Sequence, residues 1–194
     1  MKNFKYSILA GIMIGIGGIA YLSVESKLLG AFLFSFGLIT IMYQKYNLFT
    51  GQIGYVKDLN DLIKVVRVLI FNCLSVTCMG LLSSFWLKDE VLPIIQKKLA
   101  TAPLETFIKA TLCGIVIYLA VELFKKDKKG LWTPICIILF ILCGFEHCIA
   151  NTFYFATANY FSYEVFIFTL ITIIGNSFGS LLIAYLENKK ECLK

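Results

Sequence analysis

The chain has 194 residues, of which 59% are hydrophobic and 15% are charged, and its mean hydropathy is +0.81. A soluble domain is about half apolar and about a quarter charged, so this composition excludes an ordinary soluble protein and predicts an integral membrane protein. The net charge of +6 does not predict nucleic-acid binding, because the lysines gather in short segments between apolar runs, where membrane proteins place them.

Six membrane spans are predicted in chain order, because about 20 apolar residues are needed to cross the hydrocarbon core of a bilayer. The first span is interpreted as a mature helix and not as a secretory signal, since no small-residue cleavage site followed by a soluble domain comes after it. The predicted spans cover roughly residues 5–24, 28–56, 62–87, 104–124, 130–160 and 163–187.

The second and fifth spans are predicted to be broken helices. Residues 130–163 would be roughly 50 Å long as one straight helix, at about 1.5 Å per residue, and Glu146 and His147 interrupt their middle. Residues 44–47 interrupt the second span in the same way. Broken helices at membrane depth are tolerated only where the freed backbone groups face protein or a water-filled cavity, and their N-terminal ends favour anions. A site at the membrane midplane is therefore expected.

Spans one to three and spans four to six each contain a broken middle span, which predicts an inverted repeat. Both termini are predicted to be cytoplasmic, because Arg67 and most lysines lie near the chain ends or in residues 57–67 and 125–129. With no linker-like segment in the sequence, a single membrane domain is expected over residues 1–194. The lysines left for the opposite side are Lys27, Lys88, Lys97, Lys98 and Lys109.

The cysteines fall mostly in apolar runs and lack the C-x-x-C pairs of zinc and redox sites. They are therefore interpreted as small core residues, and neither a metal site nor a cofactor is predicted. The seven cysteines are Cys73, Cys78, Cys113, Cys136, Cys143, Cys148 and Cys192.

Several short segments resemble motifs of the formate/nitrite transporter family. Residues 144–151 read GFEHCIAN and resemble the G-F-E-H-x-x-A-N motif of that family. Residues 48–50 resemble its L-F-T loop, and Gly175 with Asn176 resembles its G-N pair. Lys98 is similar in placement to the family's lysine ahead of the fourth span. The resemblance extends over about residues 8–184.

The resemblance implies an all-α membrane protein with an aquaporin-like protomer of six spans, which assembles as a homopentamer in the lipid bilayer. Each subunit would have its own pore for formate, nitrite, hydrosulfide or short carboxylates, and the protein would not be an enzyme. His147 would be the central pore histidine, Thr50 its partner from the opposite break, and Lys98 the lysine that draws anions in. The hydrophobic constrictions above and below the histidine would be formed by Phe34, Leu48, Phe49 and Phe140.

The expected chemistry follows from the cost of dehydrating an anion, which Born estimates place at tens of kcal/mol. Rings of Phe and Leu side chains should therefore exclude hydrated ions. The hypothesis is that Lys98 and the half-helix N-termini concentrate the anion. It then crosses the constriction either as the neutral weak acid or held by hydrogen-bond donors from His147 and Thr50.

Structural interpretations of the same residues stay open. His147 can be a hydrogen-bonded packing residue, and Thr50 can be a helix cap. The carboxylate of Glu146 is favoured as a cap of backbone donors at the break. Asn151 and Asn176 are favoured as bridges between helices and not as substrate contacts.

Three further positions have two interpretations each. Phe34 and Phe140 can be ordinary core residues, and Lys98 can be an interfacial lysine whose ammonium group reaches toward water. Gly114 stands where the family usually carries an asparagine in its fourth span, so a polar lining group is expected to be missing there.

Two other functions are considered. Residues 175–179 fit the G-x-S-x-G pattern of serine hydrolases, with His147 as a possible base, but that motif needs a strand-to-helix turn, and an apolar span is predicted here. An aquaporin-like pore for water or neutral solutes also uses two half-helices in inverted repeats, but the paired Asn-Pro-Ala boxes of that class are missing from the sequence.

Overall fold

The computed structural model describes residues 2–127 and 132–191. Within these ranges the regular structure is entirely helical. The predicted loop lysines Lys128 and Lys129, and also Cys192, lie outside the described residues. Four helices are long and apolar enough to cross a membrane, namely α1 (Lys2–Leu22), α4 (Leu59–Leu99), α5 (Pro103–Asp127) and α8 (Tyr163–Glu191). The shorter elements are α2 (Lys27–Tyr43), α3 (Phe49–Gln52), η1 (Ile53–Tyr55), α6 (Trp132–Leu142) and α7 (Cys148–Thr157).

The outside of the helix bundle is covered by large apolar side chains. Phe85 is 86% exposed, Ile174 58% and Phe166 57%, and comparable side chains project from α2, α4 and α8. Such a surface would be insoluble in water but is well solvated by lipid chains. The outer surface therefore fits a multi-pass membrane protein.

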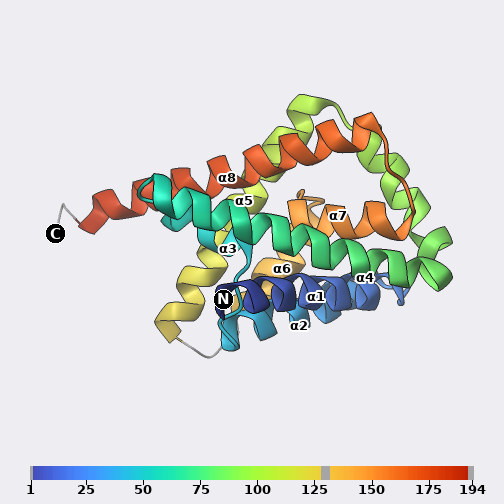
Figure 1. Ribbon diagram of the computed structural model, residues 1–194, viewed down its shortest axis with the longest axis horizontal. Helices are drawn as coiled ribbons and strands as arrows, with labels where there is room; N and C mark the ends of the chain where they lie inside the picture. Colours follow the sequence, from blue (N-terminus) through green and yellow to red (C-terminus); the bar gives the residue numbers. More distant parts are fainter. Residues whose placement is uncertain (1, 128–131, 192–194) are drawn as a thin grey trace.

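The long helices associate in pairs. α1 lies along α4, and α5 lies along α8, while α2 contacts α1 and α6, and α7 contacts α4 (Figure 1). Small residues permit the closest approaches, as at Gly179, whose Cα faces the backbone of Thr111 on α5. The two short half-helices α3 and α7 are thereby enclosed by the long ones.

Two chain segments of similar shape interrupt the helices. Residues 44–48 separate α2 from α3, and residues 143–147 separate α6 from α7. The backbone turns at Lys45, with φ 55°, and at Gly144, with φ 68°, so both turns use the left-handed region. In each, the residue after the turn donates its N–H back to a helix carbonyl, from Tyr46 to Ile41 and from Phe145 to Phe140, both at 2.9 Å.

The third span was predicted to end at residue 87, and this boundary is wrong, because α4 continues to Leu99. Leu87, Val91 and Ile95 follow one another at four-residue intervals and are 5%, 0% and 3% exposed, so the added turns keep a buried face. The charged residues between them conceal this face from a hydropathy argument. The extension carries Lys98, in the last turn of α4, to the mouth of a cavity.

Candidate substrate pathway

Two cavities enter the helix bundle from opposite ends of α2. The cavity that we call the Lys98 vestibule has a volume of about 420 Å³ and includes Lys27 at the start of α2. The Lys125 vestibule has a volume of about 640 Å³ and includes Tyr43 at the end of the same helix. Because α2 has 17 residues, these two ends lie about 25 Å apart. The pair of cavities approaches the middle of the molecule from both sides.

We give the name neck to the cluster of buried apolar side chains near His147 that includes Phe34, Leu48 and Phe140, which are 2%, 2% and 4% exposed. The rings of Phe34 and Phe140 meet edge to face with centroids 6.1 Å apart, and Phe140 also stacks on the imidazole of His147 at 6.0 Å. Leu48 lines the Lys125 vestibule, and Phe140 and His147 line the Lys98 vestibule. Leu38, which the sequence analysis did not single out, joins Leu48 on the Lys125 side and is 2% exposed.

The side chains of His147 and Thr50 meet at this neck. The Nε2 atom of His147 lies 2.9 Å from Oγ1 of Thr50, and the two residues are 3% and 1% exposed. Each residue comes from one of the two helix interruptions, so 97 positions of sequence separate them. The structure thus brings together the imidazole and the hydroxyl that the sequence analysis singled out at separate breaks.

The hydrogen bonds of His147 fix the location of its proton. Its Nδ1 atom accepts the backbone N–H of Ala150 at 3.2 Å, which caps the first turn of α7. The imidazole is therefore neutral, with its hydrogen on Nε2, and it donates to Thr50 Oγ1. The hydroxyl hydrogen of Thr50 is then available to a second acceptor in the neck. The pair forms a chain of two neutral donors.

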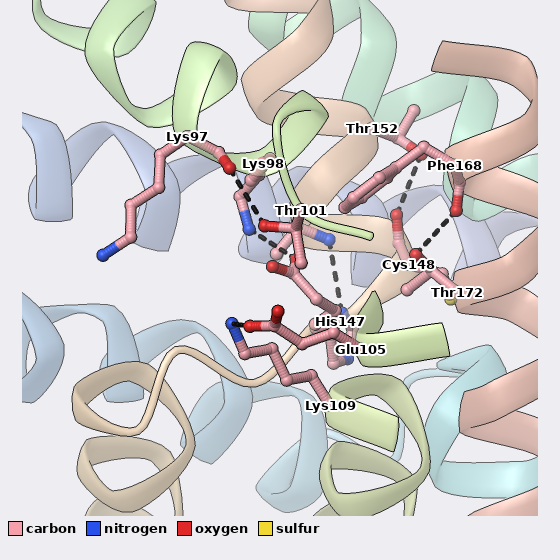
Figure 2. Close-up of polar contacts among 12 residues, drawn as sticks. Lys97, Lys98, Thr101, Glu105, Lys109, His147, Cys148, Thr152, Phe168 and Thr172 are labelled. Carbon is pink, nitrogen blue, oxygen red and sulfur yellow. Dashed lines mark hydrogen bonds and ion pairs between the residues drawn. The ribbon is translucent and has the colours of Figure 1, made fainter. Parts of the chain in front are cut away.

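Lys98 and Glu146 form a buried ion pair beside the histidine. The Nζ atom of Lys98 lies 2.5 Å from Oε2 of Glu146, and the two side chains are 14% and 5% exposed. In Figure 2 the neighbouring Lys97 reaches in another direction, and only Lys98 turns toward the segment that contains His147. The helix cap expected from Glu146 is supplied by His147 itself, while the carboxylate of Glu146 accepts from Lys98.

Other basic side chains add to the Lys98 vestibule. Its walls include Lys27, Lys97 and Lys109 in addition to Lys98. Lys109 pairs with Glu105 at 2.6 Å, as Figure 2 shows, and Lys27 donates to the carbonyl of Leu142 at 3.4 Å. Four lysines and one carboxylate, that of Glu146, line this cavity, so its potential favours anions.

Asn176 on α8 holds the second helix interruption. Its Nδ2 donates to the carbonyls of Ala110 and Glu146, both at 2.8 Å, and its Oδ1 accepts the N–H of Cys148 at 2.9 Å. The side chain thus satisfies backbone groups on both sides of His147, which the broken helix leaves without partners. This is the geometry of a bridge between helices.

Asn72 on α4 holds the first interruption in the same way, and the sequence analysis missed it. Its Nδ2 donates to the carbonyls of Ser7 and Asn47, and its Oδ1 accepts the N–H of Phe49 at 2.9 Å. The available signal was the repeat itself, because an asparagine follows each predicted break in the next apolar span.

Asn151 differs from these two asparagines. It lies one turn after His147 on α7, is 1% exposed and borders the Lys98 vestibule. Its Nδ2 atom has no hydrogen-bond partner among the residues that the structure describes. A buried amide donor without a partner is costly, so it is a ready donor for a molecule in the vestibule.

Gly114 belongs to a helix contact and not to the lining of either vestibule. A Cβ atom at this position would overlap the backbone of Asn176, and the carbonyl of Gly114 accepts a hydrogen bond from Ser180 at 3.0 Å. The sequence analysis expected a missing polar lining group here, and that expectation is wrong. The absence of a side chain lets α8 approach α5 closely enough for Asn176 to reach Ala110.

Replacing Gly114 with alanine is expected to lower the free energy of unfolding by about 1–3 kcal/mol, because α5 and α8 must move apart. Thermal unfolding in detergent measures this change. Gly51→Ala is the matched control, since a Cβ there would meet only Val121 Cγ2 at 3.6 Å, an ordinary contact. Equal melting temperatures of the two variants would contradict the close helix contact at Gly114.

The structure also describes the G-x-S-x-G segment, the residues that could bind a metal, and the cysteines. Residues 175–179 lie inside α8, where Ser177 Oγ donates to the carbonyl of Ile173, so the strand-to-helix turn of a nucleophilic serine is not formed. No group of three or more His, Cys, Asp or Glu side chains suited to a metal occurs in the described part of the chain. Cys78 and Cys143 are exposed, and Cys143 lines the Lys98 vestibule, so the interpretation of these two as core residues is wrong.

The apolar outer surface and the two cavities at opposite ends of α2 are features of a membrane channel or transporter. The chain belongs to the formate/nitrite transporter family, because the sequence profile described as Formate/nitrite transporter matches residues 1–188. Its function is transport of small monovalent anions or their weak acids, and the resemblance seen in the motifs is confirmed.

Two solved structures have the same fold. The chain is similar to a pentameric formate channel with formate bound, with a TM-score of 0.86 and 22% identity over 100% of this chain and 97% of that one. It is also similar to an FNT family ion channel, with a TM-score of 0.88 and 19% identity over 98% and 90% of the two chains. No curated protein matches the sequence.

Proposed function

We propose that small monovalent anions cross each subunit as their neutral conjugate acids, from the Lys98 vestibule past His147 and Thr50 to the Lys125 vestibule. The observation that carries the proposal is the position of the His147–Thr50 pair at an apolar neck between two lysine-bearing cavities. The substrate class is formate, nitrite, hydrosulfide or a short carboxylate, in keeping with the family.

The proposed subunit has six spans in an inverted repeat, within a single domain over residues 1–194. The spans are α1, α2 with α3 and η1, α4, α5, α6 with α7, and α8. Matching helix interruptions and the matching hydrogen bonds of Asn72 and Asn176 support the repeat. In Figure 1 α1 begins and α8 ends at the left-hand end of each helix, which supports termini on one side, proposed to be the cytoplasmic side of the cell membrane.

The proposed assembly is a homopentamer. The solved formate channel that this chain resembles along its full length is pentameric, which supports the same assembly here. The exposed apolar faces of α4 and α8 are available to lipid and to neighbouring subunits. Each subunit contains its own neck and vestibules, so no residue of a neighbour is needed to complete the pathway.

The neutral form of the substrate follows from the chemistry of the neck. Transfer of a bare anion into an apolar site costs tens of kcal/mol in Born estimates, whereas each hydrogen bond to a charged group contributes only about 1.5–3 kcal/mol net. The chain of donors from His147 to Thr50 therefore cannot offset the loss of hydration. A weak acid avoids the cost, because burial favours its protonated form.

Each residue around the neck has a separate proposed role. Lys98 and the N-terminal end of the ten-residue helix α7 raise the anion concentration in front of the neck. Glu146 holds the ammonium of Lys98 in place, and Asn151 donates its unpaired Nδ2–H to a substrate oxygen. Phe34 and Phe140, with Leu48 and Phe49, exclude hydrated ions from the neck. Asn176 holds the backbone on both sides of His147, which keeps the imidazole directed toward the neck.

Flux into liposomes containing the purified protein tests the proposal. At constant total formate above its pKa, the flux is expected to fall about tenfold for each unit of rising pH, because it follows the concentration of neutral acid. Nitrate and chloride, whose acids are strong, are expected to cross far more slowly. A formate flux independent of pH would overturn transport as the neutral acid. Glycerol swelling as fast as formate uptake would overturn an acid-selective pathway altogether.

A further inference from the structure

The Lys125 vestibule is an apolar cavity with a cationic rim. It lies between the end of α2, the first helix interruption and the last turns of α5, and its wall includes Leu38, Leu48 and Val121. Lys45 and Lys125 are the charged residues among those that line it, and the carboxylate of Glu122, outside the lining, pairs with Lys125. A cavity with low-dielectric walls and charges of one sign concentrates counter-ions.

Lys125 is held in a defined position at this rim. Its Nζ atom lies 3.0 Å from Glu122 Oε1 and 3.6 Å from the ring centroid of Tyr55. Tyr55 donates its hydroxyl to the same carboxylate oxygen at 2.5 Å and stacks on Tyr118 with centroids 5.3 Å apart. An ammonium group has three N–H donors, and Glu122 takes one of them. The arrangement therefore orients Lys125 and leaves donor capacity for a ligand.

Lys45 occupies a backbone position that disfavours any side chain. Its φ of 55° lies in the left-handed region, and the corresponding position of the second interruption is Gly144, with φ 68°. Glycine adopts this conformation without steric cost, while lysine does not. Local backbone strain of this kind clusters at functional sites. Lys45 lines the vestibule, so the turn places a lysine at its rim.

The Lys125 rim and the Lys98 vestibule each contain a lysine that pairs with a glutamate and lies near a tyrosine ring. In the Lys98 vestibule the lysine pairs with Glu146, and the ammonium lies 5.9 Å from the ring centroid of Tyr154. Tyr55 and Tyr154 both stand six residues after the first residue of their half-helix. The lysines and carboxylates do not correspond in this way, because Lys125 and Glu122 both lie on α5. The likeness is thus not a by-product of the repeat.

We infer that the Lys125 vestibule contains a second binding site for the transported monovalent anion, formed by Lys45 and Lys125. The Tyr55–Glu122 pair is a positioning pair that fixes the ammonium of Lys125. The inference rests on the proposed function for the identity of the anion. Anions then accumulate at both ends of the neck, so each vestibule serves as the entrance in one direction of flux.

Charge-selective labelling tests the site without relying on transport. A Val121→Cys reporter lines the Lys125 vestibule. Cys78→Ser with Cys143→Ser removes the exposed thiols of the described residues, and Cys192→Ser removes the cysteine outside them. The ratio of modification rates by an anionic and a cationic methanethiosulfonate reports the local potential. Lys125→Gln and Lys45→Gln are each expected to lower this ratio, together by about tenfold, the lower end of what a focused field supplies.

Two controls localise the effect. Lys126→Gln removes the same charge one residue along α5, outside the cavity lining, and is expected to leave the ratio nearly unchanged. Native Cys143, kept in a second background without the Val121→Cys change, reports the potential in the Lys98 vestibule. Its labelling ratio is expected to be unchanged by Lys125→Gln. An equal drop for Lys125→Gln and Lys126→Gln would overturn the site, because the field would then be diffuse.

Formate flux and thermal unfolding complete the test. Lys125→Gln is expected to raise the formate concentration for half-maximal flux, and Lys45→Gly is expected to do the same while raising the melting temperature, since glycine relieves the turn. A lowered labelling ratio with unchanged half-saturation would mean that the lysines set the potential but do not bind the anion, and would overturn the inference. Absence of any formate flux in the unmodified protein would instead refute the proposed function.

Discussion

Replacing Thr50 by valine is expected to lower formate flux through the reconstituted protein roughly 10- to 100-fold. Valine keeps the shape of threonine but removes the hydroxyl that accepts from His147 Nε2 and donates onward into the neck. The histidine donor is then left buried without a partner, and the substrate loses its own donor. The unpaired histidine is present with and without substrate, so only the lost donor to the substrate raises the barrier. That loss is about 1–3 kcal/mol, and each increment of about 1.36 kcal/mol in the barrier is tenfold in rate.

Two further variants separate hydrogen bonding from packing at the neck. Thr50→Ser retains the hydroxyl and is expected to recover most of the flux. Thr152→Val makes the same chemical change on α7, where the hydroxyl donates to the carbonyl of Cys148 and lines neither vestibule, and is expected to transport like the wild type. His147→Leu combined with Thr50→Val is expected to be little worse than either alone, because the two donors act in series. Wild-type flux in Thr50→Val would remove Thr50 from the pathway.

The largest loss of stability is expected from replacing Asn176 with alanine. The change leaves the carbonyl of Glu146 and the N–H of Cys148 buried without their partner, together with a lost contact to Ala110. Unsatisfied buried groups cost about 1–3 kcal/mol each, so the free energy of unfolding should fall by roughly 3–5 kcal/mol. Thermal unfolding in detergent and chemical denaturation measure the loss.

The equivalent change at the other break provides an internal comparison. Asn72→Ala removes the same set of bonds, to Ser7, Asn47 and Phe49, and is expected to destabilise the protein by a similar amount. Asn176→Asp, which burial keeps protonated, retains the acceptor and one O–H donor, so its loss should be intermediate. Ser177→Ala, on the same helix as Asn176, removes only a bond to Ile173 and should be nearly neutral. A small effect of Asn176→Ala would mean that water replaces the asparagine.

The sequence alone was sufficient to predict the membrane environment and the candidate pore residues. Hydropathy over about 20 residues is a local quantity, so the apolar runs could be read directly from the chain. The titratable residues Glu146 and His147 marked one helix interruption, and residues 44–47 marked the other. The partnership of His147 with Thr50 was available only through the family resemblance, because no pattern links positions 97 apart.

The tertiary structure decided which side chains meet. Asn72 looks like any polar residue in an apolar run until α4 is placed beside the first interruption, and Gly114 looked like a lining position until α8 was placed against it. The Lys125 rim likewise needs η1 to lie against α5. Hydropathy and helix breaks depend on consecutive residues, so they can be predicted from the sequence. Hydrogen bonds at membrane depth depend instead on which helices come together once lipid has excluded water.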